Sequence, residues 1–287
     1  MEQSANQTQS TSDLKLAFLG TGSMNGAIMR GIISAGHRPE LITATVRTPA
    51  KAEALAEETG VNAVATENDA EANLTAVADA DVVFLGVKPV GIEALAREIA
   101  DSLKPDAAVV SVAAAITIEM LERALKPGQP VVRSMPNTPL TVGLGAVGVA
   151  AGSSVSDDQL ARVVDLYAGA GIVKVVPEHL IEAVTGVSGS GPAYVFYLAE
   201  AMAKAGEELG LDADTARDLA RATVAGAGRM LDADVDPGEL RRNVTSPNGT
   251  TERAIMSFDE SGLPAIIARG AKASADRSLE ISRELQG

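Results

Sequence analysis

The residues best suited to bind a small polar ligand lie in the stretch VTSPNGTTERA, residues 244–254. A turn is predicted there, and a helical pattern follows it at once. Such a turn offers free backbone amides and the positive end of a helix dipole, which suit an anionic group. The alternative is that its hydroxyl side chains only cap the helix. The candidate residues are Ser246, Pro247, Asn248, Gly249, Thr250 and Thr251.

A second candidate site is the glycine pair Gly20 and Gly22 in FLGTGSMNGA, where an apolar strand pattern meets a helical one. Glycines at such a junction let the backbone turn tightly and approach a pyrophosphate, which the following helix N-terminus attracts. Asn25 stands at the third position of this pattern, where glycine or alanine is usual, and its larger side chain disfavours the usual close contact between helix and strand.

The next strand pattern indicates which dinucleotide binds. An NAD site places an acid after this strand to hold the ribose 2′-hydroxyl. The chain has TVRTPAK instead, so Arg47 and Thr48 favour the 2′-phosphate of NADPH, although NADH stays possible. The other interpretation of Arg47 is a solvated charge on a loop.

These motifs lie in a series of alternating strand and helix patterns. Apolar strands alternate with helices, which is typical of a doubly wound, mostly parallel Rossmann-type sheet in an α/β domain. We expect a disordered tail over residues 1–12 and the NADP-binding domain over 13–177. The expected strands are 14–20, 41–46, 61–65, 81–87, 107–112 and 130–135, with 143–152 and 171–177 as possible extensions.

The strand patterns stop after about Pro177, and an all-α domain is expected over residues 178–287. The helix predicted over 191–211 is apolar on nearly every face, and a helix of that kind is buried. We therefore expect a homodimer, possibly a higher oligomer of dimers, formed through these helices. A helical cap folded onto the sheet is the alternative.

Composition excludes several other classes of function. The chain has a net charge of −14 and no basic cluster, which argues against nucleic-acid binding. It has no cysteine, and its two histidines, His37 and His179, are far apart, so no metal site is expected. The longest apolar run, 107–118, is too short to span a membrane, and the N-terminus does not resemble a secretory signal. We expect a soluble cytoplasmic protein.

Six motifs occur in the order of a known family: GTGSM, VFLGVKP, VVSVAAAITI, VVRSMPNTP, VSGSGPAYVF and VTSPNGTT. With them the chain resembles pyrroline-5-carboxylate reductases, the last enzymes of proline biosynthesis, from about Leu14 to near the C-terminus. The resemblance implies NADPH-dependent reduction of 1-pyrroline-5-carboxylate to L-proline, by hydride transfer to the cyclic imine carbon. It places Thr251 beside the substrate nitrogen and the turn 246–251 around the substrate.

The resemblance also assigns cofactor-binding residues along the first domain. It implies a phosphate loop, an adenosine end, a turn after the fourth strand and a nicotinamide end. In that order the residues are Gly20, Gly22, Ser23 and Met24; Arg47, Thr48 and Asn73; Val87, Lys88 and Pro89; and Ala113, Ala114 and Asn137. Because the turn lies in the helical domain and the nicotinamide in the sheet domain, we expect the reaction to use both, from two subunits.

The chain departs from the family pattern at a few places, and two rival functions stay open. Asn248 replaces a usual glycine, Gly86 replaces a common alanine, and Leu144 replaces a polar residue. One rival is a β-hydroxyacid dehydrogenase, which needs a lysine base early on the first long helix of its second domain. Here the first lysine is Lys204, more than three turns along. The other is a non-catalytic NADP-binding regulatory protein, which fold alone does not exclude. The motif SGSGP is also compatible with a simple helix cap.

Overall fold

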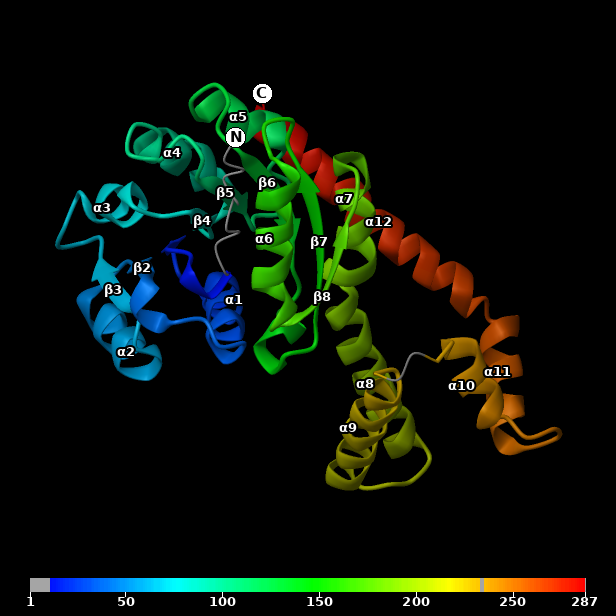
Figure 1. Ribbon diagram of the computed structural model, residues 1–287. Coiled ribbons are helices and arrows are strands. Elements are labelled where there is room, and N and C mark those ends of the chain that lie inside the picture. The colour runs from blue at the N-terminus through cyan, green and yellow to red at the C-terminus, as the bar shows by residue number, and fades with distance from the viewer. Residues whose placement is uncertain (1–10, 233–234, 287) are drawn as a thin grey trace, which may run out of the picture. The chain divides into compact units, whose positions relative to one another are not determined.

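A single eight-stranded sheet forms the framework of the first part of the chain (Figure 1). The computed structural model describes residues 11–232 and 235–286. The strands are β1 (Leu16–Leu19), β2 (Ile42–Val46), β3 (Asn62–Ala65), β4 (Val82–Leu85), β5 (Ala108–Ser111), β6 (Val131–Met135), β7 (Gly145–Ala151) and β8 (Gly171–Val175). Their order is β3-β2-β1-β4-β5-β6-β7-β8, and only the β6–β7 pair is antiparallel. This is the doubly wound arrangement that the sequence predicts.

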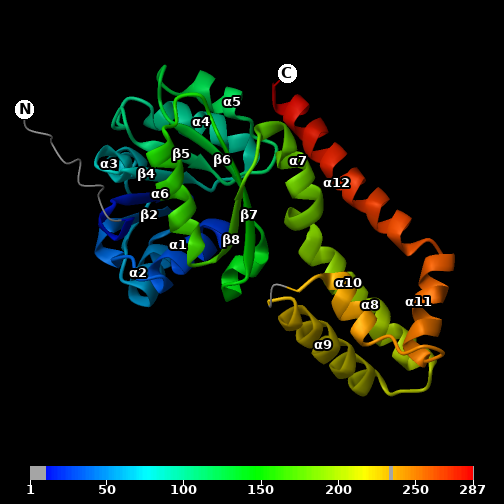
Figure 2. The same ribbon diagram turned by 45° about the vertical axis from the view of Figure 1, so that its right-hand side comes forward.

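Helices cover both faces of this sheet, as Figures 1 and 2 show. The helices of this part are α1 (Ser23–Ser34), α2 (Pro49–Thr59), α3 (Ala72–Ala78), α4 (Pro89–Ile99), α5 (Ile118–Ala124), α6 (Asp157–Ala168) and α7 (Ile181–Val184). One apolar cluster contains side chains of α1, α2 and α6, and the other contains side chains of α3, α4, α5 and α7. The strands between them are buried on both sides, which explains their continuous apolar runs.

Local sequence signals set the ends of these helices. Pro49 stands in the first turn of α2, and Gly60 ends that helix in the left-handed conformation, with its N–H bonded to Ala56 O. Ser156 and Gln159 form a reciprocal capping box at the start of α6. These features depend on neighbouring residues alone.

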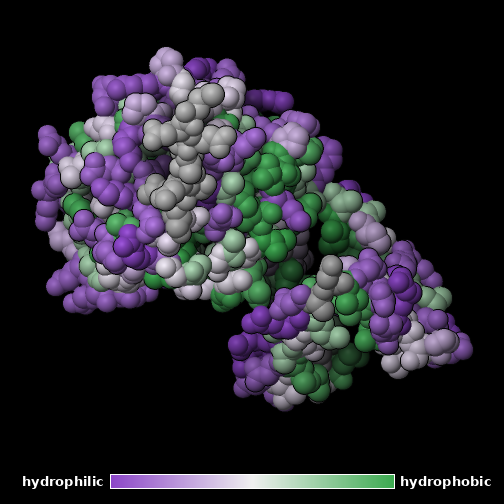
Figure 3. All heavy atoms as spheres, viewed as in Figure 1, coloured by the Kyte–Doolittle hydropathy of each residue, from purple (hydrophilic) through white to green (hydrophobic). Residues whose placement is uncertain are grey.

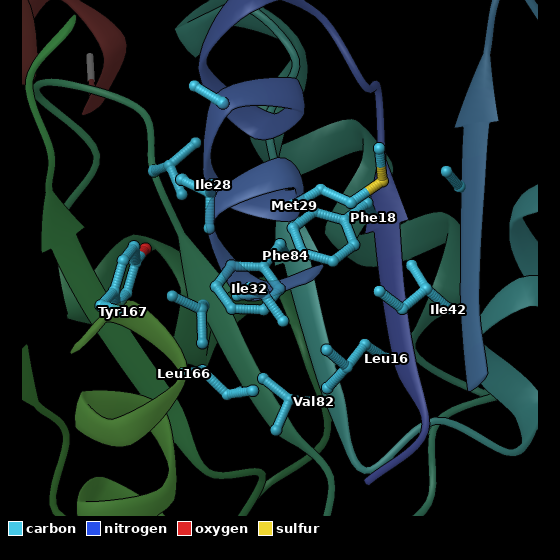
Figure 4. Close-up of a cluster of buried hydrophobic side chains, with 14 of the residues drawn as sticks. Leu16, Phe18, Ile28, Met29, Ile32, Ile42, Val82, Phe84, Leu166 and Tyr167 are labelled. Carbon is cyan, nitrogen blue, oxygen red and sulfur yellow. The ribbon is translucent and has the colours of Figure 1, made fainter. Parts of the chain in front are cut away.

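Aromatic side chains fill the centre of the first cluster (Figure 4). The rings of Phe18 and Phe84 are stacked with centroids 4.5 Å apart, and Tyr167 meets Phe84 edge to face at 5.8 Å. Phe18 lies on β1 and Phe84 on β4, so this contact joins the two strands that flank the switch point of the sheet.

The chain divides into two compact units. The first ends at Gly189 and also contains the residues from Ser274 on, and the second contains residues 190–273. The expected boundary at residue 177 marks where the strands end. The remaining α-helices are α8 (Gly191–Glu208), α9 (Ala213–Met230), α10 (Pro237–Asn243), α11 (Thr250–Glu260) and α12 (Leu263–Gln286).

The second unit exposes an unusual number of apolar side chains, and Figure 3 shows green, apolar areas on it. None of the 18 residues of α8 is buried, although Phe196, Tyr197 and Leu198 lie on it. Within the described residues these side chains therefore have too little cover, which is what the sequence predicts for helices that meet another copy of the chain.

Most predicted elements are confirmed. All eight expected strand segments, including the two possible extensions, belong to the sheet. The predicted tail lies outside the described residues up to residue 10, whereas Thr11 and Ser12 belong to a short 3-10 helix, η1 (Thr11–Asp13). Among the described residues, no helix is long and apolar enough to cross a bilayer, and no group of three His, Asp or Glu side chains is placed to hold a metal.

Candidate active site

The predicted cofactor residues gather at one edge of the sheet. Because β1, β2, β4, β5 and β6 are parallel, their carboxyl ends meet at this edge. The strand order reverses between β1 and β4, which are paired with each other. Ligands of doubly wound sheets bind in the crevice at such a switch point. The loops that carry the glycine pair and the Val-Lys-Pro turn follow these two strands directly.

The phosphate loop has the backbone that its glycines predict. Gly20 has a φ of +70°, and a β-carbon there would lie 2.5 Å from Val87 Cγ1. Gly22 is the residue before α1, and a β-carbon on it would meet nothing within 4 Å. Ser23 and Met24 begin α1, and no acceptor among the described residues bonds their N–H groups. This open helix N-terminus fits a pyrophosphate group.

A relay of side-chain hydrogen bonds supports this loop from the second strand. The Gly20 N–H donates to Thr45 Oγ1 at 3.2 Å, and the Thr45 hydroxyl donates to Asn73 Oδ1 at 2.9 Å. Asn73 Nδ2 in turn donates to Glu98 at 3.0 Å. Asn73, expected near the adenosine ribose, is thus linked to the phosphate loop through Thr45. Thr45 was not anticipated from the sequence, where it is one of two threonines in β2 and nothing distinguishes it from Thr43.

Arg47 and Thr48 follow β2 at the same edge. The Arg47 side chain is 83% exposed, and its Nε lies 3.2 Å from Glu67 Oε1. Thr48 is the N-cap residue of α2, but its side chain makes no capping hydrogen bond. Both side chains are therefore accessible to an anionic group, and the contact with Glu67 is weak because both partners are exposed.

The Val-Lys-Pro turn connects β4 to α4. Val87 packs against the phosphate loop at Gly20, as the close approach of its Cγ1 shows. Lys88 is the N-cap residue of α4, and Pro89 occupies the first turn. Proline at that position begins the helix. No ion pair of Lys88 occurs among the described residues, which leaves its charge available at the strand end.

Ala113 and Ala114 lie in the turn after β5, which contains a non-glycine residue in the left-handed region, Ala115, with a φ of +66°. The Ala113 N–H donates to Ser111 Oγ at 3.4 Å. Buried hydrogen bonds hold the preceding strand, because the Ser134 hydroxyl lies 3.2 Å from Ser111 O and 2.8 Å from Tyr167 OH. Burial raises the pKa of Tyr167, so this hydroxyl stays protonated.

Asn137 uses its amide within the protein. Its Nδ2 donates to Ser188 O at 3.0 Å, and its Oδ1 accepts the N–H of Ala146 at 2.9 Å. Asn137 therefore fixes the start of β7 and the π-helix η5 (Thr185–Gly189) to the end of β6. A direct contact of Asn137 with the nicotinamide stays a prediction.

The turn at 246–251 leads into α11 in the second unit. Asn248 has a φ of +58°, and its N–H donates to Glu252 Oε2 at 2.8 Å. Asparagine tolerates the left-handed region better than most residues, which accounts for its place at a position where glycine is usual. The N-cap residue is Gly249, and no side chain caps the helix. The interpretation of the hydroxyls as caps is therefore wrong.

Thr250 and Thr251 are the first two residues of α11. Neither their N–H groups nor their hydroxyls have a partner among the described residues. The turn thus presents open donors, as the sequence analysis expects. In the SGSGP motif, Pro192 is in the first turn of α8, and Ser190 makes no side-chain capping bond.

A buried ion-pair network near the end of β6 was not anticipated. Arg133 Nη2 lies 2.6 Å from Glu182 Oε1, and Nη1 lies 3.4 Å from Glu178 Oε1. Glu178 Oε1 also accepts the N–H of Ile118 at 2.7 Å. The network holds α7 and the residues before η5 to the sheet. A single arginine in an apolar strand pattern was its only signal in the sequence.

Two cavities lie near these elements. One of about 530 Å³ is lined by Ser23 on α1 and by Thr141 on η3 (Thr138–Val142), so it adjoins the phosphate loop. The other, of about 290 Å³, is lined by Lys15, Thr43 and Asp79 and by none of the predicted residues. We therefore place the cofactor site at the carboxyl ends of the strands and not at this second cavity.

Comparison with known proteins settles which family the chain represents. A family model described as pyrroline-5-carboxylate reductase dimerisation matches residues 178–281, and one described as NADP oxidoreductase coenzyme F420-dependent matches residues 15–115. A pyrroline-5-carboxylate reductase of Pseudomonas aeruginosa is 42% identical over 273 residues, which cover 94% of this chain and 98% of that protein. The chain belongs to the pyrroline-5-carboxylate reductase family.

Other members of the pyrroline-5-carboxylate reductase family are similar over the same length. The reductase of Escherichia coli is 35% identical and covers 94% of this chain and 98% of its own. The structure of a reductase from Coxiella burnetii has a TM-score of 0.85 and 36% identity, covering 95% of this chain and 98% of that one. The resemblance noted in the sequence is confirmed, and so is the Rossmann-type fold followed by a helical region.

Proposed function

We propose that this protein reduces 1-pyrroline-5-carboxylate to L-proline with NADPH, as the last step of proline biosynthesis. The observation that carries the proposal is the similarity over almost the whole chain to proteins named pyrroline-5-carboxylate reductase, at up to 42% identity. The open phosphate loop at the switch point and the hydroxyl-rich turn before α11 supply the parts that this reaction needs.

The first unit binds the cofactor in this proposal. The N–H groups of Ser23 and Met24 hold the pyrophosphate, and Gly20 and Gly22 allow the backbone to approach it. Arg47 and Thr48 contact the 2′-phosphate, which gives a preference for NADPH while NADH is still accepted. Lys88 adds positive charge at the same edge. When bound, the cofactor supplies the hydride that reduces the imine.

The remaining assigned residues complete this proposal. Asn73 acts near the adenosine ribose, and Val87 and Pro89 form a wall of the cofactor crevice. At the nicotinamide end lie Ala113, Ala114 and Asn137. Asn73 and Asn137 contribute by holding neighbouring segments in place, because their side-chain amides form hydrogen bonds within the protein.

The second unit binds the substrate in this proposal. The free N–H groups at the start of α11 and the hydroxyls of Ser246 and Thr250 hold the carboxylate, and Pro247, Asn248 and Gly249 shape the turn. The Thr251 hydroxyl hydrogen-bonds the ring nitrogen and orients it. A cyclic imine is readily protonated near neutral pH, so orientation accounts for most of what these residues contribute.

A coupled test separates this function from the two rivals. NADPH oxidation is followed at increasing concentrations of pyrroline-5-carboxylate and, in parallel, of small β-hydroxyacids with NADP. We expect turnover with the imine alone, since Lys204 lies near the end of α8 rather than near its start. Oxidation of a β-hydroxyacid without imine reduction would favour the dehydrogenase, and cofactor binding with no turnover would favour a regulatory protein.

The same proposal includes a homodimer formed through the helical region. The match of residues 178–281 to a dimerisation model and the lack of buried residues on α8 support it. Light scattering at micromolar concentration tests it and also tests a higher oligomer of dimers; a stable, active monomer would contradict it. A cytoplasmic location, expected from the sequence, completes the proposal.

A further inference from the structure

Asn25 lies buried in α1 at the switch point of the sheet. It is 1% exposed, and its Nδ2 donates to Leu19 O at 3.1 Å and to Phe84 O at 3.3 Å. Leu19 is the last residue of β1, and Phe84 lies near the end of β4. Both partners are carbonyl oxygens, so the amide must present its nitrogen to them. One side chain thus joins the helix to the two strands between which the cofactor crevice opens.

These two hydrogen bonds reinforce the last backbone hydrogen bond between β1 and β4. Leu19 O also accepts the N–H of Gly86 at 2.9 Å, and the next strand residues diverge into the phosphate loop and the Val-Lys-Pro turn. A carbonyl oxygen accepts two hydrogen bonds, so Asn25 adds to the ladder instead of competing with it. The position where the strands begin to separate is therefore set by this amide.

Gly86 leaves the space that the amide occupies. A β-carbon on Gly86 would lie 2.2 Å from Asn25 Nδ2 and 2.3 Å from its Cγ. Neither atom can move away easily, because the amide is held by two carbonyls and has no room in the core. Asparagine at 25 departs from the usual glycine fingerprint and glycine at 86 from the family pattern, and the two are thus one feature of the structure.

We propose that Asn25 is a positioning residue for the cofactor, and that Gly86 is the partner its side chain requires. The amide sets the distance between the phosphate loop and the Val-Lys-Pro turn, whose Val87 contacts Gly20. Asn25 Oδ1 is buried and accepts no hydrogen bond from the described residues. Such an unsatisfied oxygen lowers the stability of the fold. An asparagine at this position therefore indicates a role besides packing. This inference rests on the proposed use of NADPH.

The test measures NADPH dissociation constants from the fluorescence of the cofactor, together with melting temperature and steady-state kinetics. Asn25→Ala and the similarly shaped Asn25→Leu, which has no donor and no charge, are expected to weaken NADPH binding about tenfold, since small displacements of binding groups have effects of this order or larger. The KM for the imine at saturating NADPH should stay within about twofold. Asn62→Ala, at the exposed first position of β3, is the matched control.

The coupling is tested with Gly86→Ala in two backgrounds. In the wild type this change should weaken NADPH binding and lower the melting temperature strongly; beside Asn25→Ala it should cost much less, because the new β-carbon then occupies the space of the amide. Gly91→Ala, whose β-carbon would make an ordinary 3.5 Å contact, is the control. The double variant keeps the test informative if a single variant does not fold.

Two results would overturn the inference. One is an Asn25→Ala protein with a lowered melting temperature but unchanged NADPH affinity, because Asn25 would then have a structural role alone. The other is an equal penalty for Gly86→Ala in both backgrounds. A wild-type protein that fails to bind NADPH would instead refute the proposed function, so the two failures are distinguishable.

Discussion

Replacing Thr251 with alanine separates a role in the reaction from a role in the fold. The N-cap of α11 is Gly249, so Thr251 is the second helical residue and does not cap the helix. Its hydroxyl has no partner among the described residues. The change therefore removes no internal hydrogen bond, and alanine is the better helix former by up to about 0.7 kcal/mol. We expect Thr251→Ala to leave the free energy of unfolding unchanged or slightly raised.

The effect on the reaction should be much larger. If the hydroxyl bonds the ring nitrogen, its loss removes a charge-assisted hydrogen bond worth roughly 1.5–3 kcal/mol, or about ten- to a hundredfold in kcat/KM. The affinity for NADPH should barely change, because the residues assigned to it belong to the other unit.

The assay measures kcat/KM for pyrroline-5-carboxylate at saturating NADPH and the melting temperature on the same preparations. Thr251→Val keeps the shape and removes the hydroxyl, so it should behave like Thr251→Ala, whereas Thr251→Ser should keep most of the activity. An alanine variant with kcat/KM within twofold of the wild type would refute the role of this hydroxyl in the reaction.

Three further outcomes are expected. Arg47→Asp should reverse the preference for NADPH over NADH and raise the KM for NADPH about tenfold or more, since it replaces an attractive charge by a repulsive one; a wild type that already prefers NADH would contradict the assignment. Glu182→Ala leaves Arg133 buried without its closest partner, so unfolding in urea should show a loss of roughly 3–5 kcal/mol, and replacing both residues by methionine should cost less. Burial lowers the pKa of His37 below 6.5, so folding disfavours its protonation and stability should fall as the pH drops below that value; His37→Gln should show a smaller decrease in melting temperature, and an equal decrease would contradict this.

The features that the sequence predicts well depend on residues close together in the chain. The strand and helix segments follow from apolar periodicity, from Pro49 and Gly60 at the ends of α2 and from the glycines of the phosphate loop. Six motifs in order were sufficient to indicate the family. The cofactor residues could also be assigned to one sheet edge, because strand ends of a parallel sheet meet there whatever the side chains do.

Other features depend on residues that only the folded chain brings together. In the sequence, Asn25 and Gly86 are two unrelated departures from the usual residues. In the structure they are in contact, although 61 positions (86 − 25) separate them in the chain. The Thr45 relay and the ion pair of Arg133 with Glu182 likewise join segments that no local pattern relates.

The capping interpretation of the turn before α11 failed for a related reason. Asn248 in the left-handed region places Gly249, and no hydroxyl, at the N-cap. The sequence alone determined which segments are strands and helices, because local backbone preferences and apolar periodicity are short-range. The tertiary structure decided which polar atoms meet, because burial forces each buried amide and charge to find a partner that can lie anywhere in the chain.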